Sequence, residues 1–325
     1  MKSLAIVGAG IAGLTLATRL QKHANVTVFE KSAGYGGRLA TRRSGAYQFD
    51  HGAQYFTARS AEFRQFLDIH RDAALVRDWQ PRTLTLGGDK EPYTRPWFEP
   101  HWVAAPGMTS LCESLARNLR VELDAEVTSI CPANEGWMVN LLSGAQRGPY
   151  DWFISTAPAP QACNLMPADF LHYQELEKLN MSGCFSLMLG YQLPLSLSFQ
   201  AAKVTNSPIG WLALDSSKPG RSGPSCLLAQ TTNQWADVNL DGPALEIRQL
   251  LLSELQRLLP QLPDPDHVDL QRWRYAAATS SLQQDCLLDD QRQLAACGDW
   301  CLGARVEAAF TSAARLAARL QILLD

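Results

Sequence analysis

The first thirty residues constrain the fold most, because a short apolar strand runs directly into a glycine-rich turn. Residues 4–8 are apolar, the turn reads GAGIAG (8–13), and apolar side chains then recur at helical spacing up to Leu20. A second buried strand over residues 26–30 ends on Glu30. Strand, turn, helix, strand and acid in this order predict a Rossmann-type βαβ unit that binds a dinucleotide.

Each glycine of the turn meets a physical demand of that unit. Gly8 allows the tight turn, Gly10 lets the backbone approach a pyrophosphate, and Gly13 permits the helix to pack closely on the strand. The helix N-terminus offers free N–H groups and its positive dipole end to the phosphates. Glu30 can accept a hydrogen bond from a ribose 2′-hydroxyl, which favours NAD or FAD over NADP without separating the first two.

The next segment favours FAD. Residues 31–38 (KSAGYGGR) resemble the second glycine–arginine signature of the amine-oxidase-like flavoprotein superfamily. In this interpretation Gly36 and Gly37 let the backbone run along the pyrophosphate, and Arg38 donates charge-assisted hydrogen bonds to it.

A third nucleotide signal lies near the other end of the chain, where CGDW (297–300) precedes a long amphipathic helix. In glutathione-reductase-type flavoproteins a strand that ends in Gly-Asp places the Asp against the ribityl chain, and we assign this role to Asp299. The N-terminus of the following helix, around Val306 and Glu307, would then point at the flavin pyrimidine, where negative charge gathers on reduction.

Composition and charge exclude several classes of protein. The chain of 325 residues has a formal net charge of −3, which gives no basic field for nucleic acid. No apolar run approaches the roughly 20 residues that cross a bilayer, and the N-terminus has no secretory apolar region. We expect a cytoplasmic protein without a nucleic-acid or membrane partner, and the sequence leaves its oligomeric state open.

The eight cysteines predict neither disulfides nor a metal site. They form no C-x-x-C pair and have no histidine at the spacing of a zinc site. We expect them to be small buried apolar side chains.

A β-rich region lies between the nucleotide signals, so we predict two interleaved domains in an α/β fold. The predicted glutathione-reductase-type FAD-binding Rossmann domain takes residues 1–70, 105–170 and 286–325. The β-rich substrate domain takes residues 71–104 and 171–285. Periodicity further predicts helices over 60–67, 108–119 (with Thr109 as N-cap), 244–259 and from Val306, and antiparallel strands over 121–130 and 136–142.

Taken together, the chain resembles the bacterial branch of the renalase family of flavoproteins over nearly its whole length. The segments that carry the resemblance are GAGIAG (8–13), GYGGRLATRRS (34–44), FDHGAQYFTAR (49–59), APGM (105–108), STAPAPQA (155–162), WLALDSSKP (211–219), TTNQW (231–235), RWRYA (272–276) and CGDWCLGARVEAAF (297–310). The GAQYFTA and CGDWC segments are more specific than the glycine signatures, which many flavoproteins share.

The resemblance implies a substrate domain like that of p-hydroxybenzoate hydroxylase and a non-covalent FAD. It also implies oxidation of 2-dihydro-NAD(P), and by extension 6-dihydro-NAD(P), to NAD(P)⁺, with dioxygen reduced to hydrogen peroxide. A dihydronicotinamide releases hydride by electron push from its own ring nitrogen, so no acid/base residue is required and none is assigned. The residues assigned to the cofactor are Gly8, Gly10, Ile11, Ala12, Gly13, Glu30, Lys31, Gly36, Gly37, Arg38, Gly52, Ala53, Gln54, Val127, Gly298, Asp299, Arg305, Val306 and Glu307.

The substrate slot needs flat apolar walls and a few polar groups that orient a carboxamide. The residues predicted to form it are Gln54, Tyr55, Trp211, Gln230, Thr231, Trp235, Tyr275 and Trp300. Ordinary core packing is the alternative for each Trp. Gln230 stands where many family members carry His, which removes a proton donor there. His51 is more simply a positional variant than an acid/base group.

Two other functions stay open at this stage. A flavin amine oxidase would use an aromatic cage and often a lysine-anchored water, but no lysine follows Asp299 in its segment. A non-catalytic FAD-binding redox protein would need a reactive cysteine, and none stands in an electropositive C-x-x-C setting.

Overall fold

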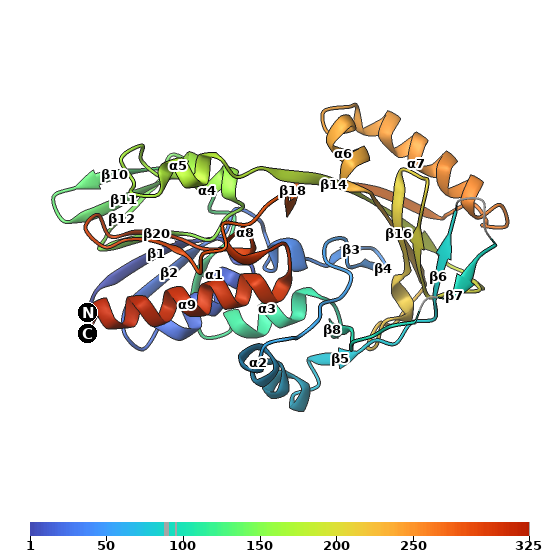
Figure 1. Ribbon diagram of the computed structural model, residues 1–325, viewed down its shortest axis with the longest axis horizontal. Coiled ribbons are helices and arrows are strands. Elements are labelled where there is room, and N and C mark those ends of the chain that lie inside the picture. The colour runs from blue at the N-terminus through green and yellow to red at the C-terminus, as the bar shows by residue number, and fades with distance from the viewer. Residues whose placement is uncertain (88–90, 95, 325) are drawn as a thin grey trace.

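The structure is a computed structural model and describes residues 1–87, 91–94 and 96–324. It has two lobes side by side, with both termini together at the outer end of the first lobe (Figure 1). None of the helices in these described ranges is long and apolar enough to cross a membrane.

The first lobe contains the predicted βαβ unit in a six-stranded sheet with the order β19-β20-β13-β1-β2-β9. Its strands are β1 (Ser3–Val7), β2 (Asn25–Phe29), β9 (Arg120–Glu122), β13 (Trp152–Ser155), β19 (Leu287–Asp289) and β20 (Leu294–Ala296). β1 pairs in parallel with both β2 and β13, as a buried Rossmann sheet requires.

Helices cover one face of this sheet and a small antiparallel sheet covers the other (Figure 1). The helices are α1 (Ile11–Leu20), α3 (Thr109–Ala116) and α9 (Val306–Leu324), and the small sheet consists of β10 (Val127–Ala133), β11 (Gly136–Leu141) and β12 (Gln146–Tyr150) beside α4 (Ala159–Leu165) and α5 (Tyr173–Glu177). α9 follows its predicted periodicity, since Phe310, Ala313, Ala317 and Leu320 are all buried.

Two sequence expectations for this lobe are wrong. The strand predicted over 121–130 divides into β9, which joins the Rossmann sheet beside β2, and β10, which pairs with β11. Thr109 is not the N-cap of α3, because the cap position is Met108. The hydroxyl of Thr109 instead accepts a hydrogen bond from the backbone N–H of Thr41 (2.6 Å).

The second lobe is a seven-stranded sheet with the order β18-β14-β17-β16-β15-β6-β7. Its elements are β6 (Thr83–Leu86), β7 (Tyr93–Thr94), β14 (Met181–Tyr191), β15 (Ala201–Val204), β16 (Ile209–Leu214), β17 (Ser225–Thr231) and β18 (His267–Ala278), with α6 (Asn233–Asn239) and α7 (Ala244–Leu258) on its outer face. The long strands β14 and β18 extend from the sheet to the first lobe (Figure 1).

Further short elements complete the two lobes and their junction. They are the 3₁₀ turns η1 (Gly37–Leu39) and η2 (Asp215–Ser217), the hairpin β3 (Arg42–Ser44) and β4 (Tyr47–Phe49), the pair β5 (Val76–Asp78) and β8 (Trp102–Ala104), α2 (Ala61–Asp72) and α8 (Asp299–Leu302). Val76 and Val103, within the segment predicted to belong to the substrate domain, pack in the same core as Phe63 and Phe310 of the first lobe. β6, from the same segment, pairs with β15 of the second lobe. The domain division therefore stays a prediction.

Candidate active site: the cleft between the lobes

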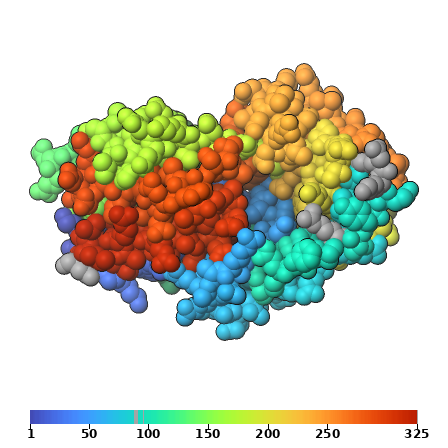
Figure 2. Space-filling model, in the orientation of Figure 1, coloured from blue at the N-terminus to red at the C-terminus, as the bar shows by residue number. Residues whose placement is uncertain are grey.

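A cleft of about 1630 Å³ separates the two lobes and is lined from both of them. The space-filling view shows the surface hollowed at this junction, with blue N-terminal chain visible in the hollow (Figure 2). Most of the predicted cofactor and substrate residues line this cleft, although they come from segments far apart in the sequence.

The glycine turn after β1 has the shape that a dinucleotide needs. Gly8 has φ +104°, a conformation that favours glycine, and a Cβ on Gly13 would lie 1.9 Å from the carbonyl oxygen of Gly8. Gly10 is the N-cap of α1, and a Cβ there would meet nothing nearer than the carbonyl oxygen of Gly36 at 3.7 Å. The backbone is therefore open to a phosphate group just where the helix begins.

Glu30 has a second task that the sequence did not reveal. Its carboxylate accepts hydrogen bonds from the backbone N–H groups of Ala9 (2.8 Å) and Ser32 (2.9 Å). It therefore joins the glycine turn to the end of β2. Because each carboxylate oxygen has two lone pairs, the predicted bond to a ribose hydroxyl is still available at this cleft-lining position.

Arg38 and Asp299, predicted separately as cofactor contacts, lie against each other in the cleft. The guanidinium donates two hydrogen bonds to the carboxylate, at 2.8 and 2.6 Å, and one to the carbonyl oxygen of Ala276 (3.2 Å). The Asp299 side chain is only 5% exposed. The glycine–arginine signature and the Gly-Asp signature thus converge on one point, 261 residues apart in sequence.

Glu307 does not line the cleft, in contrast to its neighbours Arg305 and Val306. Its carboxylate accepts hydrogen bonds from the backbone N–H groups of Arg59 (3.0 Å) and Ser60 (2.6 Å), just before α2. Although burial raises its pKa, these hydrogen bonds hold that pKa below its usual value. The carboxylate of Glu307 therefore anchors α2, and the predicted contact of this region with the flavin stays a prediction for the backbone at the start of α9.

The remaining residues assigned to the cofactor separate into those in the cleft and one behind it. Those that line the cleft are Ile11, Ala12, Lys31, Gly36, Gly37, Gly52, Ala53, Gln54, Val127 and Gly298. Gly13 lies behind this surface and packs against Gly8, as its predicted role requires.

The cleft wall beside Arg38 contains residues 51–55 of the segment from Asp50 to Tyr55. Gln54 and Gln230 line the cleft, but their amides hold this segment together. Gln54 Nε2 donates to the carbonyl oxygen of Gly52 (3.0 Å), and so does Gln230 Nε2 (2.7 Å). The amide of Gln54 is therefore already engaged by the protein, which limits its ability to orient a substrate carboxamide.

Thr231 is similarly engaged at the edge of the cleft. Its hydroxyl accepts a hydrogen bond from the backbone N–H of Phe185 (2.9 Å), which joins β17 to β14. The hydroxyl oxygen keeps a further acceptor site, so Thr231 can accept a hydrogen bond from a ligand while it also joins the two strands.

Aromatic rings gather on the substrate side of the cleft. The centroid of the His101 ring lies 4.2 Å from the ring centroid of Tyr55 and 3.6 Å from that of Trp97. Trp211 lies 5.8 Å from Tyr55, and its indole N–H is buried without a hydrogen-bond partner among the described residues. Tyr55, His101, Trp211 and also Tyr275 line the cleft. Trp97 and His101 were not predicted, since an irregular proline-containing segment gives no periodic signal.

Two of the predicted tryptophans are packing residues. Trp235 lies in α6, outside the cleft lining, with its ring 5.9 Å from that of Phe185. Trp300 is fully buried beneath Gly298, and its indole N–H donates to the carbonyl oxygen of Ala157 (3.1 Å). The predicted place of these two residues in the substrate slot is therefore wrong, and core packing is what they do.

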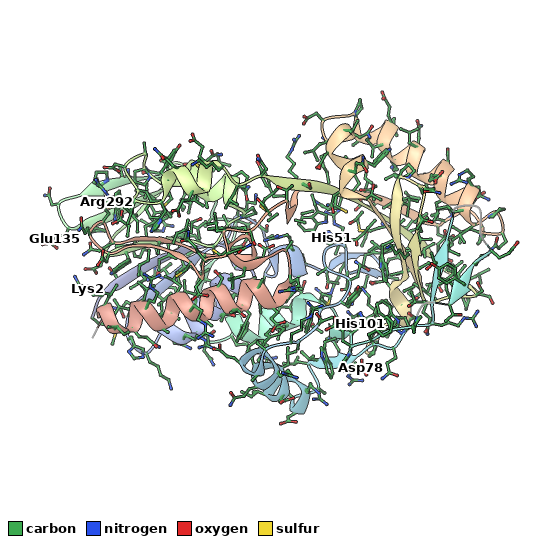
Figure 3. All side chains as sticks on the ribbon, viewed as in Figure 1. Lys2, His51, Asp78, His101, Glu135 and Arg292 are labelled. Carbon is green, nitrogen blue, oxygen red and sulfur yellow. The ribbon has the colours of Figure 1, made fainter. Side chains whose placement is uncertain are left out.

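His51 lies at the junction of the two lobes (Figure 3) and is 6% exposed. Its ring stacks on Trp273 at 5.0 Å, and its carbonyl oxygen accepts hydrogen bonds from Ser186 (2.7 Å) and Trp273 (2.8 Å). Burial, together with the positive charge of Arg42, lowers the pKa of His51 to about 4. The imidazole is neutral near pH 7, which argues against a charged acid in the reaction.

Behind the Asp50–Tyr55 segment lies a cluster of four buried charges, Asp50, Asp215, Lys218 and Arg221, which we call the ionic quartet. The side chains of Asp50, Asp215 and Lys218 are 0% exposed and that of Arg221 is 3% exposed. Asp50 pairs with Lys218 and Arg221, and Lys218 also pairs with Asp215. Burial raises the pKa of Asp50, but the two cations more than offset this and hold it below its usual range.

The cleft carries more positive than negative charge. Among the described residues, eight lysine and arginine side chains line it, against five aspartate and glutamate side chains, although the whole chain has a net charge of −3. Two of these cations, Arg42 and Arg274, form ion pairs with Asp269 and Asp241, which lie outside the lining. A cleft with this charge raises the local concentration of an anionic ligand. Within the described ranges no group of acidic, cysteine or histidine side chains could hold a metal ion.

Comparison with known proteins agrees with this geometry. Residues 6–69 match the model for an NAD(P)-binding Rossmann-like domain, and residues 96–321 match the model for flavin containing amine oxidoreductases. The chain belongs to the flavin containing amine oxidoreductase family. FAD is therefore its cofactor, and the protein is an FAD-dependent oxidoreductase.

Similar proteins include the renalase of Mus musculus, which is 24% identical over 304 residues, or 87% of each chain. A 1-hydroxycarotenoid 3,4-desaturase from a Flavobacterium species is 48% identical over 58 residues, which are 18% of this chain and 12% of the desaturase. Among solved structures, a putrescine oxidase with bound putrescine superposes with a TM-score of 0.74 at 14% identity over 98% of each chain. The chain is thus a renalase-like member of its family, with the fold of the amine oxidases.

Proposed function

We propose that this protein oxidises misreduced dihydronicotinamide dinucleotides, 2-dihydro-NAD(P) and also 6-dihydro-NAD(P), to NAD(P)⁺. The observation that carries the proposal is the positive charge of a cleft that also has aromatic walls. The lining cations Arg42, Arg59 and Arg272 come from segments other than the glycine turn. Arg42 and Arg59 are paired with Asp269 and Glu99, so a pyrophosphate would share these cations with the carboxylates. A dinucleotide substrate brings a flat ring and a pyrophosphate, which match these two features.

The size of the cleft supports the same substrate. At about 1630 Å³ it exceeds the roughly 300–1,000 Å³ of an ordinary ligand pocket, so it has room for FAD and for a second large molecule. When bound, FAD would accept a hydride from the substrate and pass the two electrons to dioxygen, which takes up protons and leaves as hydrogen peroxide.

The residues of this chain would bind and orient the substrate without moving a proton. Tyr55, Trp211 and Tyr275 offer ring faces, and the neutral His51 offers a polar edge. Hydride transfer from a dihydronicotinamide needs no base, because the lone pair of the ring nitrogen expels the hydride. The contribution of the protein is to hold the reacting atoms within about 3–3.5 Å and to exclude other orientations.

The proposal keeps the finer features of the sequence prediction. They are a non-covalently held FAD in a glutathione-reductase-type arrangement, a second lobe like the substrate domain of p-hydroxybenzoate hydroxylase, and a cytoplasmic location.

A small-amine oxidase is the second candidate. The rings of Tyr55, Trp97, His101 and Trp211 could attract a cation through their faces. However, the excess of positive charge opposes a cationic substrate. Among the described residues that line the cleft, moreover, Lys31 is the one lysine, and it lies beside Glu30, at the end where the ribose is expected.

Oxygen consumption with a panel of substrates tests the proposal. We would supply 2-dihydro-NAD, 6-dihydro-NAD, putrescine and an aromatic amine separately, and measure oxygen uptake together with NAD⁺ formed. The expected result is one NAD⁺ per dioxygen with a dihydro-NAD isomer and no uptake with the amines. Turnover of an amine alone would favour the second candidate, and no turnover of any compound would favour a non-catalytic FAD-binding protein.

A further inference from the structure

The segment from Asp50 to Tyr55 contributes residues 51–55 to the cleft wall beside Arg38, and both lobes hold its backbone. From the first lobe, the carbonyl oxygen of Arg38 accepts a hydrogen bond from the N–H of Ala53 (2.8 Å). From the second lobe, Ser186 and Trp273 donate to the carbonyl oxygen of His51. A side chain at Gly52 would lie 2.1 Å from the carbonyl oxygen of Arg38, so this backbone has almost no room to move.

The ionic quartet fixes the beginning of this segment. Asp50 accepts hydrogen bonds from the hydroxyl of Thr41 (2.7 Å) and the N–H of Met108 (3.0 Å), in addition to its two ion pairs. Its own backbone N–H donates to Asp215 (2.9 Å). Two anions and two cations balance the buried charge, which is the condition under which such a cluster is tolerated.

Lys218 is the member of the quartet that also reaches the end of the segment. Its ammonium donates to Asp50 (3.2 Å) and to the side-chain oxygen of Gln54 (3.3 Å). Gln54 in turn donates to the carbonyl oxygen of Gly52 (3.0 Å). One buried ammonium, from the turn after η2 in the second lobe, therefore hydrogen-bonds both Asp50 at the start of the segment and Gln54 near its end.

We propose that Lys218 is a positioning residue for the cleft wall, acting through Gln54 on the segment from Asp50 to Tyr55. Gln54 is followed directly by Tyr55, whose ring lies against His101 and Trp211. When the Lys218–Gln54 contact is lost, Tyr55 and the backbone of Gly52 and Ala53 change their place relative to the flavin. The glycine turn and Glu30 do not take part in this contact, so most of the predicted FAD contacts stay in place. Gly52, Ala53 and Gln54 are also assigned to the cofactor, so FAD affinity should fall, but by less than the rate of flavin reduction.

This inference rests on the FAD-dependent activity of the family and holds for either candidate substrate. Only its kinetic test uses a dihydronicotinamide. A spectroscopic test on the FAD-bound protein covers the case in which the substrate is a different one.

Two variants remove the contact in different ways. Gln54→Met deletes the Gln54 oxygen that accepts from the Lys218 ammonium, together with the bonds that Gln54 Nε2 donates to the carbonyl oxygens of Asp50 and Gly52, and leaves all four charges of the quartet in place. The double variant Lys218→Met/Asp215→Asn deletes one cation and one anion, which leaves Asp50 paired with Arg221 and the buried charge balanced. The conservative variant Lys218→Arg keeps a donor at the same place. The matched control is Arg292→Met/Asp169→Asn, an ion pair of 2.7 Å that is exposed at the far end of the first lobe.

Three quantities are measured for each protein: the rate of flavin reduction, the Kd for FAD and the visible circular dichroism of the bound flavin. We expect Gln54→Met and the double variant to reduce their flavin on the order of 10²-fold more slowly, as for a small misplacement of the reacting groups. The Kd for FAD should rise by less than about tenfold, which is clearly less than the fall in rate. The visible dichroism should change in both, recover in part in Lys218→Arg and stay unchanged in the control.

An unchanged rate and unchanged visible dichroism in Gln54→Met would overturn the proposal, because the contact would then have no effect at the flavin. An equal loss of rate and FAD affinity would also overturn it, since Lys218 would then only support the fold. If the double variant fails to fold, Gln54→Met decides alone. If no dihydronicotinamide reduces the wild type, the proposed substrate is wrong, and the dichroism still decides the role of Lys218.

Discussion

The two walls of the cleft differ in how the chain builds them. The nucleotide wall comes mainly from the first forty residues, where turn, helix and strand follow one another without interruption. The facing wall is assembled from segments near residues 50, 100, 185, 211, 230 and 275, and is held together by side chains. A ligand shared by many proteins is thus bound by local backbone geometry, whereas the part that meets the substrate depends on long-range contacts.

Replacing Trp300 tests the layer that lies behind the cleft. Trp300→Ala should lower the free energy of unfolding by about 3–5 kcal/mol, because the side chain is fully buried and the cavity cannot refill. Trp211→Ala, at the cleft surface, should lower it much less and should slow flavin reduction instead. Chemical denaturation followed by fluorescence measures the free energy of unfolding of both variants. Similar stability losses in the two variants would contradict the distinction between packing layer and wall.

Breaking the nucleotide wall alone should abolish cofactor binding. In Gly13→Ala the new Cβ would lie 1.9 Å from the backbone oxygen of Gly8, so the turn must open. We expect FAD affinity to fall at least about 100-fold, or about 2.7 kcal/mol. Gly34→Ala is the matched control, because a Cβ there meets nothing within 4 Å. Titration of the apoprotein with FAD measures both, and tight binding by Gly13→Ala would refute the assigned turn.

A smaller effect is expected from the neutral histidine of the facing wall. The pKa of His51 is lowered to about 4 by burial and by Arg42, against the opposing charges of Asp50 and Asp269. Below about pH 6.5 the unfolded chain binds a proton on this ring that the folded protein does not bind, so stability falls as pH falls from 6.5 towards 4. The loss at pH 5 is about 2 kcal/mol.

His51→Phe keeps a ring against Trp273 and removes the titrating group, so it should flatten this pH dependence. The measurement is the denaturation midpoint of wild type and variant between pH 4.5 and 7.5. Parallel curves for the two proteins would mean that His51 does not contribute to the slope.

The same difference between the walls explains what could be predicted from the sequence. The spacing of Gly8, Gly10 and Glu30 within one βαβ unit predicts β1, α1 and β2, and the structure has these elements in that order. α9 was predicted through its long apolar periodicity.

The ionic quartet could not be predicted in this way, because burial of a charge leaves no mark on the local pattern. Asp215, Lys218 and Arg221 look in sequence like an ordinary solvated turn before β17. The sequence likewise does not distinguish the role of Trp300 from that of Trp211. Only the tertiary structure shows that one packs beneath Gly298 and the other lines the cleft.

Anaerobic rapid mixing of the FAD-bound protein with 2-dihydro-NAD tests the central claim most directly. The absorbance of the oxidised flavin near 450 nm reports reduction in a single turnover, without dependence on the electron acceptor. Our account predicts fast, complete bleaching with stoichiometric formation of NAD⁺, and no bleaching by putrescine at the same concentration. Bleaching by putrescine while both dihydro-NAD isomers leave the flavin oxidised would contradict it.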